Sequence, residues 1–165
     1  MNRTADVVIV GAGVIGSATA FELAKRGYKT LNIDKLPASG YGSTSNSCAI
    51  VRAHYSTWDG VAMAYEGFFY WDDWNKYLEV EDERGMAKYM KTGSIMFMLK
   101  GADHSKKSLN LFKEIGVEHE IWDLETLKKK MPIYSHDSYN GTSRPDEDDS
   151  FFDKSGDQIE GAVWT

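Results

Sequence analysis

The sequence predicts an α/β fold that begins with a βαβ unit, the repeating element of doubly wound parallel sheets. Residues 6–10 form a continuous, largely β-branched run that ends in glycine, which is typical of a strand buried on both faces of a parallel sheet. A pattern of helical length follows over residues 14–26, and its basic last turn and terminal glycine suit a helix end. A second strand-like run over residues 30–34 completes the unit, for which we expect a right-handed crossover.

The composition is that of a soluble protein that can bury a hydrophobic core. Of the 165 residues, 42% are apolar and 27% are charged, as in ordinary globular domains. The sequence lacks the roughly 20 consecutive apolar residues that a membrane span requires, and we expect no secretory signal. The single cysteine has no partner for an internal disulfide, so the sequence predicts a cytoplasmic protein.

The net charge argues against nucleic acid as a partner, and the spacing of potential metal-binding residues argues against a metal site. The formal net charge is −6, and no basic stripe is present that could follow a nucleic-acid backbone. The acidic residues 146–149 lack EF-hand spacing, and neither CxxC pairs nor clustered histidines indicate zinc. We therefore expect no nucleic acid and no metal, and we expect residues 146–149 to lie in a solvated loop.

The remaining chain predicts a long loop followed by an α+β region. Residues 36–47 are nearly all turn formers and small hydroxyl residues, and long loops of this kind are usually functional or disordered. Apolar residues at spacings of three and four predict one helix over residues 60–78, with its aromatic stripe packed in the core. Shorter elements follow: strand material over 89–99 interrupted at 92–94, a helix over 103–115, a strand over 118–122, a helix over 123–131 capped by Asp123, a polar loop over 135–150 and a strand over 161–164.

A glycine motif at the end of the first strand predicts dinucleotide binding. Gly11, Gly13 and Gly16 have the spacing GxGxxG, and the motif lies between a strand and a helix, as its function requires. In such a turn the first glycine allows the tight bend, the second admits the pyrophosphate, and the third lets helix and strand pack closely. The helix N-terminus offers free amides and about half a positive charge to the phosphates.

An acidic residue at the end of the second strand narrows the choice of dinucleotide. Asp34 lies eighteen positions after Gly16, where its carboxylate can accept both hydroxyls of an adenosine ribose. The same carboxylate would repel a 2′-phosphate, which argues against NADP. Both FAD and NAD satisfy these residues.

Beyond this motif the sequence resembles the FAD-dependent amine and amino-acid oxidoreductases of the D-amino-acid oxidase superfamily, especially the branch of sarcosine oxidase and dimethylglycine dehydrogenase. The matching landmarks occur in family order at residues 7–34, 42–45, 49–55, 92–97 and 161–164. The resemblance implies FAD as the cofactor. It also implies that the ADP half of FAD is bound by Gly11, Gly13, Gly16 and Asp34, with Lys35 beside the adenosine, and that the pyrophosphate and flavin are followed by Ser43, Thr44 and Ser45.

The resemblance further implies a substrate-binding role for residues 52–55. Arg52 matches the arginine that pairs with the substrate carboxylate in sarcosine oxidase-like members, and the alternative is a structural salt bridge. His54 and Tyr55 either line the site or serve as packing residues. Members often carry a second arginine where this chain has Ala49, which bears on substrate preference. Because residues 40–48 contain no histidine, we expect no covalent flavin link in this segment, and we assign no catalytic residue.

Family chains are more than twice as long, so the resemblance implies that this chain is the N-terminal fragment of an enzyme or one of its subunits. Residues 1–85 would form the first part of a Rossmann-like FAD-binding domain. Residues 86–165 would form the start of a substrate-binding domain and the return toward the FAD-binding domain, and the fold would be incomplete without further chain. The implied reaction is oxidation of a secondary or tertiary amine of a small amino acid by hydride transfer to flavin. The implied partners are that substrate and the rest of the enzyme. The alternative is a non-catalytic subunit that binds FAD or NAD, either as a regulatory subunit or as a remnant of an enzyme.

Overall fold

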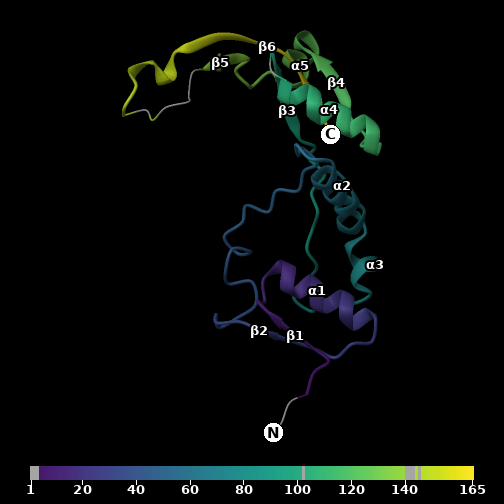
Figure 1. Ribbon diagram of the computed structural model, residues 1–165. Coiled ribbons are helices and arrows are strands. Elements are labelled where there is room, and N and C mark those ends of the chain that lie inside the picture. Colours follow the sequence, from purple (N-terminus) through teal and green to yellow (C-terminus); the bar gives the residue numbers. More distant parts are fainter. Residues whose placement is uncertain (1–3, 102, 140–143, 145) are drawn as a thin grey trace. The chain divides into compact units, whose positions relative to one another are not determined.

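The computed structural model describes residues 4–101, 103–139, 144 and 146–165 and divides the chain into two compact units (Figure 1). The first unit is Met1–Ile50 and the second is Val51–Thr165. The predicted boundary near residue 85 separates functional domains rather than packing units, and it stays a prediction.

The first unit is the predicted βαβ unit. Strand β1 (Val7–Val10) leads into helix α1 (Val14–Lys25) and then into strand β2 (Thr30–Ile33). The two strands are parallel, and their register runs from Val7 opposite Thr30 to Val10 opposite Ile33. The sequence pattern thus predicted all three elements to within a residue or two. The long loop after β2 is also confirmed, because residues 36–47 form only turns and bends.

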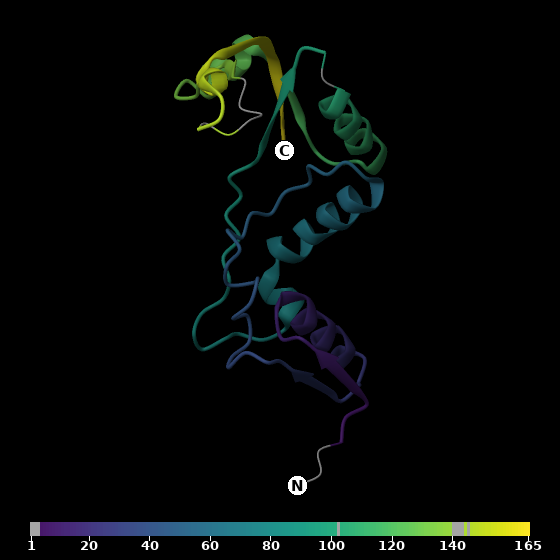
Figure 2. The same cartoon turned by 60° about the vertical axis from the view of Figure 1, so that its left-hand side comes forward.

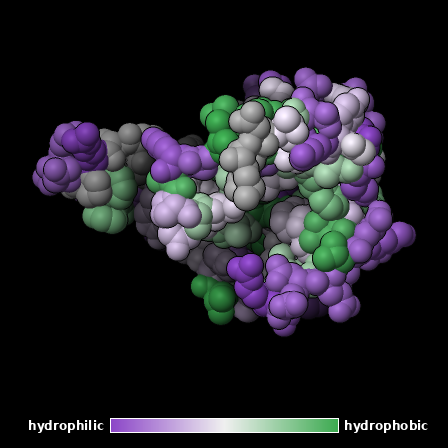
Figure 3. All heavy atoms as spheres, turned by 90° about the horizontal axis from the view of Figure 1, so that it is seen from below, coloured by the Kyte–Doolittle hydropathy of each residue, from purple (hydrophilic) through white to green (hydrophobic). Residues whose placement is uncertain are grey.

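The expectation that the first strand is buried on both faces is wrong. Val8 is 55% exposed and Val10 is 84% exposed, whereas Val7 and Ile9 are partly buried. Among the described residues β1 pairs only with β2, and α1 shields one face of this pair. Exposed apolar residues occur in other parts of the chain too, and Figure 3 shows hydrophobic (green) spheres among hydrophilic (purple) ones on one face of the molecule.

In the second unit, the single helix predicted over residues 60–78 is instead two helices. Helix α2 (Trp58–Asp72) is capped by Thr57, whose hydroxyl accepts a hydrogen bond from the amide of Gly60. Asp73 leaves the helical conformation (φ −125°, ψ 56°), and the short helix α3 (Trp74–Leu78) follows. The aromatic residues stay in contact across this break, since Trp71 and Trp74 stack on each other with ring centroids 4.5 Å apart.

An antiparallel sheet in the order β3-β6-β4 organises the rest of the second unit. Its strands are β3 (Ile95–Leu99), β4 (Glu120–Asp123) and β6 (Lys154–Trp164), and β5 (Asp137–Tyr139) also pairs with β6. Three expectations need correction: β3 starts six residues later than predicted, β6 starts seven residues earlier, and β5 lies inside the predicted polar loop. The central strand β6 has hydrogen-bonded partners along both edges. Its length is therefore set by pairing with these strands, and the apolar pattern of the sequence covers only its last part.

The remaining helices lie where the sequence predicts them. Helix α4 (Asp103–Ile115) matches its predicted bounds, and α5 (Leu124–Lys130) is capped by Asp123, which accepts a hydrogen bond from the amide of Thr126 (2.8 Å). A 3₁₀ turn, η1, spans Asp149–Phe152, so part of the predicted loop is ordered.

Helices pack on both faces of the sheet in the second unit, and Figure 2 shows α4 beside the strands. One cluster joins α2, α4 and the sheet through Val61, Phe112 and Val163; the other joins α5 and the sheet through Leu127 and Trp122. None of the helices in the described part of the chain combines the length and apolarity needed to cross a membrane.

Candidate dinucleotide and substrate site

The three glycines form a tight turn between β1 and α1. Gly11 has φ +112°, a conformation that favours glycine, and its amide donates to the carbonyl of Ile33 (2.8 Å). A Cβ atom on Gly16 would lie 2.1 Å from the carbonyl oxygen of Gly11. The start of α1 therefore approaches the turn as closely as the dinucleotide motif requires.

Asn32, which the sequence analysis missed, holds this turn. Its side-chain amide donates to the carbonyl of Gly11 (3.2 Å) and to that of Gly16 (3.0 Å). The signal was present in the sequence, because asparagine is disfavoured inside a strand and lies between Leu31 and Ile33.

Asp34 follows β2 directly and reaches the same turn. One carboxylate oxygen accepts from the amide of Ala12 (2.7 Å), and the other accepts from the amide of Leu36 (2.9 Å). These backbone hydrogen bonds, from Leu36 first and Ala12 second, lower the pKa of Asp34. The side chain is exposed, and each carboxylate oxygen keeps a further lone pair with which it can accept a ribose hydroxyl. The adjacent Lys35 is exposed, and its charge also lowers the pKa of Asp34.

The loop of small residues reaches the glycine turn through Thr44. The Thr44 hydroxyl accepts from the amide of Val14 (3.0 Å) and would lie 3.1 Å from a Cβ on Gly13. Thr44 thus supplies the cap that Gly13, at the N-cap position of α1, lacks. Ser45 bonds within the loop to the carbonyl of Gly42 (3.2 Å), and Ser43 is exposed in the same loop.

This arrangement fits the ADP half of a dinucleotide. Backbone amides, small hydroxyl side chains and the positive end of α1 meet at the turn, and the first turn of α1 contains no acidic residue. A pyrophosphate would therefore meet the positive end of the α1 helix dipole.

Arg52 and Tyr55 lie together in the second unit. Both side chains are exposed, and the guanidinium carbon of Arg52 lies 5.8 Å from the centroid of the Tyr55 ring, within cation–π distance. No carboxylate among the described residues forms an ion pair with Arg52. The guanidinium is therefore available to a ligand of opposite charge.

His54 contacts the core of the second unit. Its Nε2 atom lies 3.1 Å from the hydroxyl of Thr165, and its ring centroid lies 5.2 Å from that of the buried Phe112. Burial, followed by the positive charge of Arg52, lowers the pKa of His54 and favours a neutral imidazole. Ala53 is fully buried beside it, so this segment is fixed to the core between two exposed side chains.

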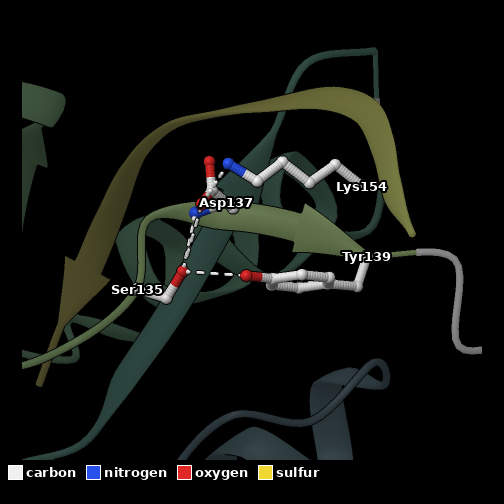
Figure 4. Close-up of polar contacts among 4 residues, drawn as sticks. All are labelled: Ser135, Asp137, Tyr139 and Lys154. Carbon is white, nitrogen blue, oxygen red and sulfur yellow. Dashed lines mark hydrogen bonds and ion pairs between the residues drawn. The ribbon is translucent and has the colours of Figure 1, made fainter. Parts of the chain in front are cut away.

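A second polar cluster carries no comparable chemistry. Figure 4 shows Ser135, Asp137, Tyr139 and Lys154 joined by hydrogen bonds and an ion pair of 2.9 Å between Lys154 and Asp137. All four residues are exposed, and the ion pair raises the pKa of Lys154, which keeps its amine protonated and unsuited to act as a base. Within the described ranges, no group of three His, Cys, Asp or Glu side chains could hold a metal ion.

Comparison with known proteins identifies the family. The sequence pattern of the DAO family, described as FAD dependent oxidoreductase, matches residues 6–159. The chain is 29% identical over 149 residues to monomeric sarcosine oxidase of Bacillus sp. (strain B-0618), covering 88% of this chain and 37% of the relative. It is 28% identical over 129 residues to peroxisomal sarcosine oxidase of Homo sapiens, covering 77% of this chain and 31% of the relative.

A solved structure shares the fold. The crystal structure of L-proline dehydrogenase from P. horikoshii superposes with a TM-score of 0.71 at 19% identity, covering all of this chain and 37% of that one. The chain thus spans about a third of the length of the relatives it matches. Since the family pattern extends over nearly the whole sequence, the chain belongs to the DAO family of FAD-dependent oxidoreductases.

Proposed function

We propose that this chain forms the ADP-binding and carboxylate-binding part of an enzyme that oxidises the amine of a small amino acid of the sarcosine, dimethylglycine or glycine type. The chain spans about a third of its relatives, so the complete enzyme includes further polypeptide, either as a continuation of this chain or as a companion subunit. FAD, when bound, supplies the acceptor for the hydride equivalent that leaves the carbon next to the amine nitrogen.

The chain's own residues bind and orient in this proposal. The glycine turn and the N-terminus of α1 hold the pyrophosphate, and Asp34 accepts the ribose hydroxyls. Thr44 holds the loop over the turn, with Ser43, Ser45 and Lys35 beside the cofactor. Arg52 receives the substrate carboxylate and Tyr55 supports its guanidinium, while His54 anchors the segment that carries them.

The exposed guanidinium of Arg52 is the observation that carries the substrate assignment. A structural arginine is normally satisfied by a neighbouring carboxylate, but in the described part of the chain Arg52 forms no ion pair with a carboxylate and lies near the Tyr55 ring. A planar guanidinium within cation–π distance of an aromatic ring is well suited to bind a carboxylate through two parallel hydrogen bonds.

Replacing Arg52 with lysine tests this assignment in the complete enzyme. Lysine keeps the charge and loses the two-bond geometry, so we expect KM for amino-acid substrates to rise roughly tenfold while flavin content stays constant. Amines without a carboxylate should respond much less. Steady-state kinetics on both substrate classes make the comparison, with Arg84→Lys at an exposed position as the matched control. Equal losses on both classes, or no loss on either, would contradict the proposal.

Replacing Asp34 with alanine tests the cofactor half. The variant loses an acceptor of charge-assisted hydrogen bonds, worth about 1.5–3 kcal/mol, so we expect the dissociation constant of FAD to rise about tenfold or more. Titration of the apoenzyme with FAD, followed by flavin fluorescence, measures this change. Asp103→Ala, which removes an exposed carboxylate from α4, serves as the control. An unchanged FAD affinity for the Asp34 variant would show that this carboxylate does not contribute to the cofactor site.

A further inference from the structure

We infer that Asn32 is a positioning residue of the cofactor site, whose side-chain amide holds the glycine turn in the shape that receives the FAD pyrophosphate. The inference goes beyond residues known to touch a dinucleotide, and it rests on the proposed assignment of the glycine turn to FAD.

The Asn32 amide joins the two ends of the turn. Its Nδ2 atom has two hydrogens, and it donates to the first glycine carbonyl, at Gly11, and to the last, at Gly16. These carbonyls are five residues apart in sequence, so one side chain fixes the distance between the end of β1 and the first turn of α1. The partly buried position shields both hydrogen bonds from water.

Asn32 and Asp34 act on the turn from the same side of β2. Residues two apart in an extended segment point to the same face, which places both side chains toward the glycines. Asn32 donates to the carbonyls at the ends of the turn, whereas Asp34 accepts from the amide of Ala12 in its middle (2.7 Å). Asn32 therefore supplies the donor that two carbonyls of the turn need, and Asp34 supplies the acceptor that one amide of the turn needs.

This geometry bears directly on anion binding. A hydrogen bond from Asn32 directs the Gly11 carbonyl toward β2, and a carbonyl that turned instead toward a phosphate would repel it. A turn that is already shaped before binding also avoids the entropic cost of ordering it around the ligand. Asn32 should thus affect FAD affinity without touching FAD.

Asn32→Leu in the apoenzyme separates positioning from general stability. Leucine has nearly the same size and a higher preference for strands, so we expect the variant to fold, with a melting temperature lowered by the loss of two partly buried hydrogen bonds. The loss of two hydrogen bonds to the turn should raise the dissociation constant of FAD about tenfold. Asn110→Leu makes the same chemical change at an exposed position on α4 and should leave FAD affinity unchanged.

Asn32→Asp provides a second measurement if the leucine variant does not fold. A carboxylate at this position faces two carbonyl oxygens and repels them, whereas its protonated form donates one hydrogen bond. The ratio of the FAD dissociation constants of variant and unmodified enzyme should therefore fall as the pH is lowered from about 8 to about 5. A side chain with a packing role alone would give a ratio that does not depend on pH.

The outcomes distinguish this inference from the proposed function. An Asn32→Leu variant that folds with unchanged FAD affinity, or a pH-independent ratio for Asn32→Asp, overturns the role of Asn32. Loss of FAD affinity on Asp34→Ala in the same titration would show that the proposed site survives that result. If neither the Asp34 nor the Asn32 variant changes FAD affinity, the assignment of this turn to FAD fails, and the inference fails with it.

Discussion

Alanine at Gly16 is expected to weaken FAD binding by roughly a hundredfold, the largest effect of any single substitution in the cofactor site. The added Cβ would lie 2.1 Å from the Gly11 oxygen and 3.0 Å from the Gly11 carbonyl carbon. Both are backbone atoms, so α1 must move away from the turn. Overpacking of this kind costs about 1–3 kcal/mol, and here the displacement falls on the amides that would meet the pyrophosphate.

The measurement is again titration of the apoenzyme with FAD, together with a thermal melt. Gly67→Ala in α2 is the control, because a Cβ there meets open space and the residue lies outside the proposed cofactor site. We expect this control to bind FAD normally. A Gly16→Ala variant that folds and binds FAD with unchanged affinity would refute the close approach of helix and turn on which the site depends.

Alanine at Gly161 is expected to produce the largest loss of stability in the second unit. Gly161 lies opposite Asp123 in the pairing of β4 and β6, and a Cβ there would lie 2.1 Å from the carbonyl oxygen of Trp122. Relief of this clash requires the two strands to separate. We expect the free energy of unfolding to fall by about 2–3 kcal/mol.

Denaturant unfolding followed by tryptophan fluorescence suits this test, because Trp122 and Trp164 stack on the same face of the sheet, with ring centroids 5.9 Å apart. Gly67→Ala in α2 is the control, since a Cβ there meets open space and alanine favours the helix. This control should be as stable as the unmodified protein or slightly more so. Equal unfolding midpoints for both variants would contradict the strand pairing.

The features that sequence predicted well depend on local chemistry. The glycine spacing, the strands around it and the position of Asp34 follow from residues close in sequence, and the structure brings Gly11, Gly16 and Asp34 together at one turn. The N-cap of α5 at Asp123 is equally local. The family was predicted from landmarks spread over residues 7–34, 42–45, 49–55, 92–97 and 161–164, and the family pattern that matches residues 6–159 confirms it.

The features that sequence did not predict depend on distant partners. Strand β6 contains polar residues that resemble a loop, and it is a strand because β3, β4 and β5 pair with it. Asn32 is spaced as a strand residue, and only the fold reveals that its amide faces Gly11 and Gly16. The exposure of Val10 likewise depends on which elements cover β1. The β-branched composition of the strand does not indicate which elements these are.

The uncovered valines of β1 have a consequence for self-association. Strand β1 presents aliphatic side chains to solvent, and β2 is its pairing partner in the described part of the chain. A strand with an open edge and an aliphatic face invites pairing with other chains and promotes aggregation. A chain in which these valines stay exposed is therefore expected to self-associate, and equilibrium stability does not measure this hazard.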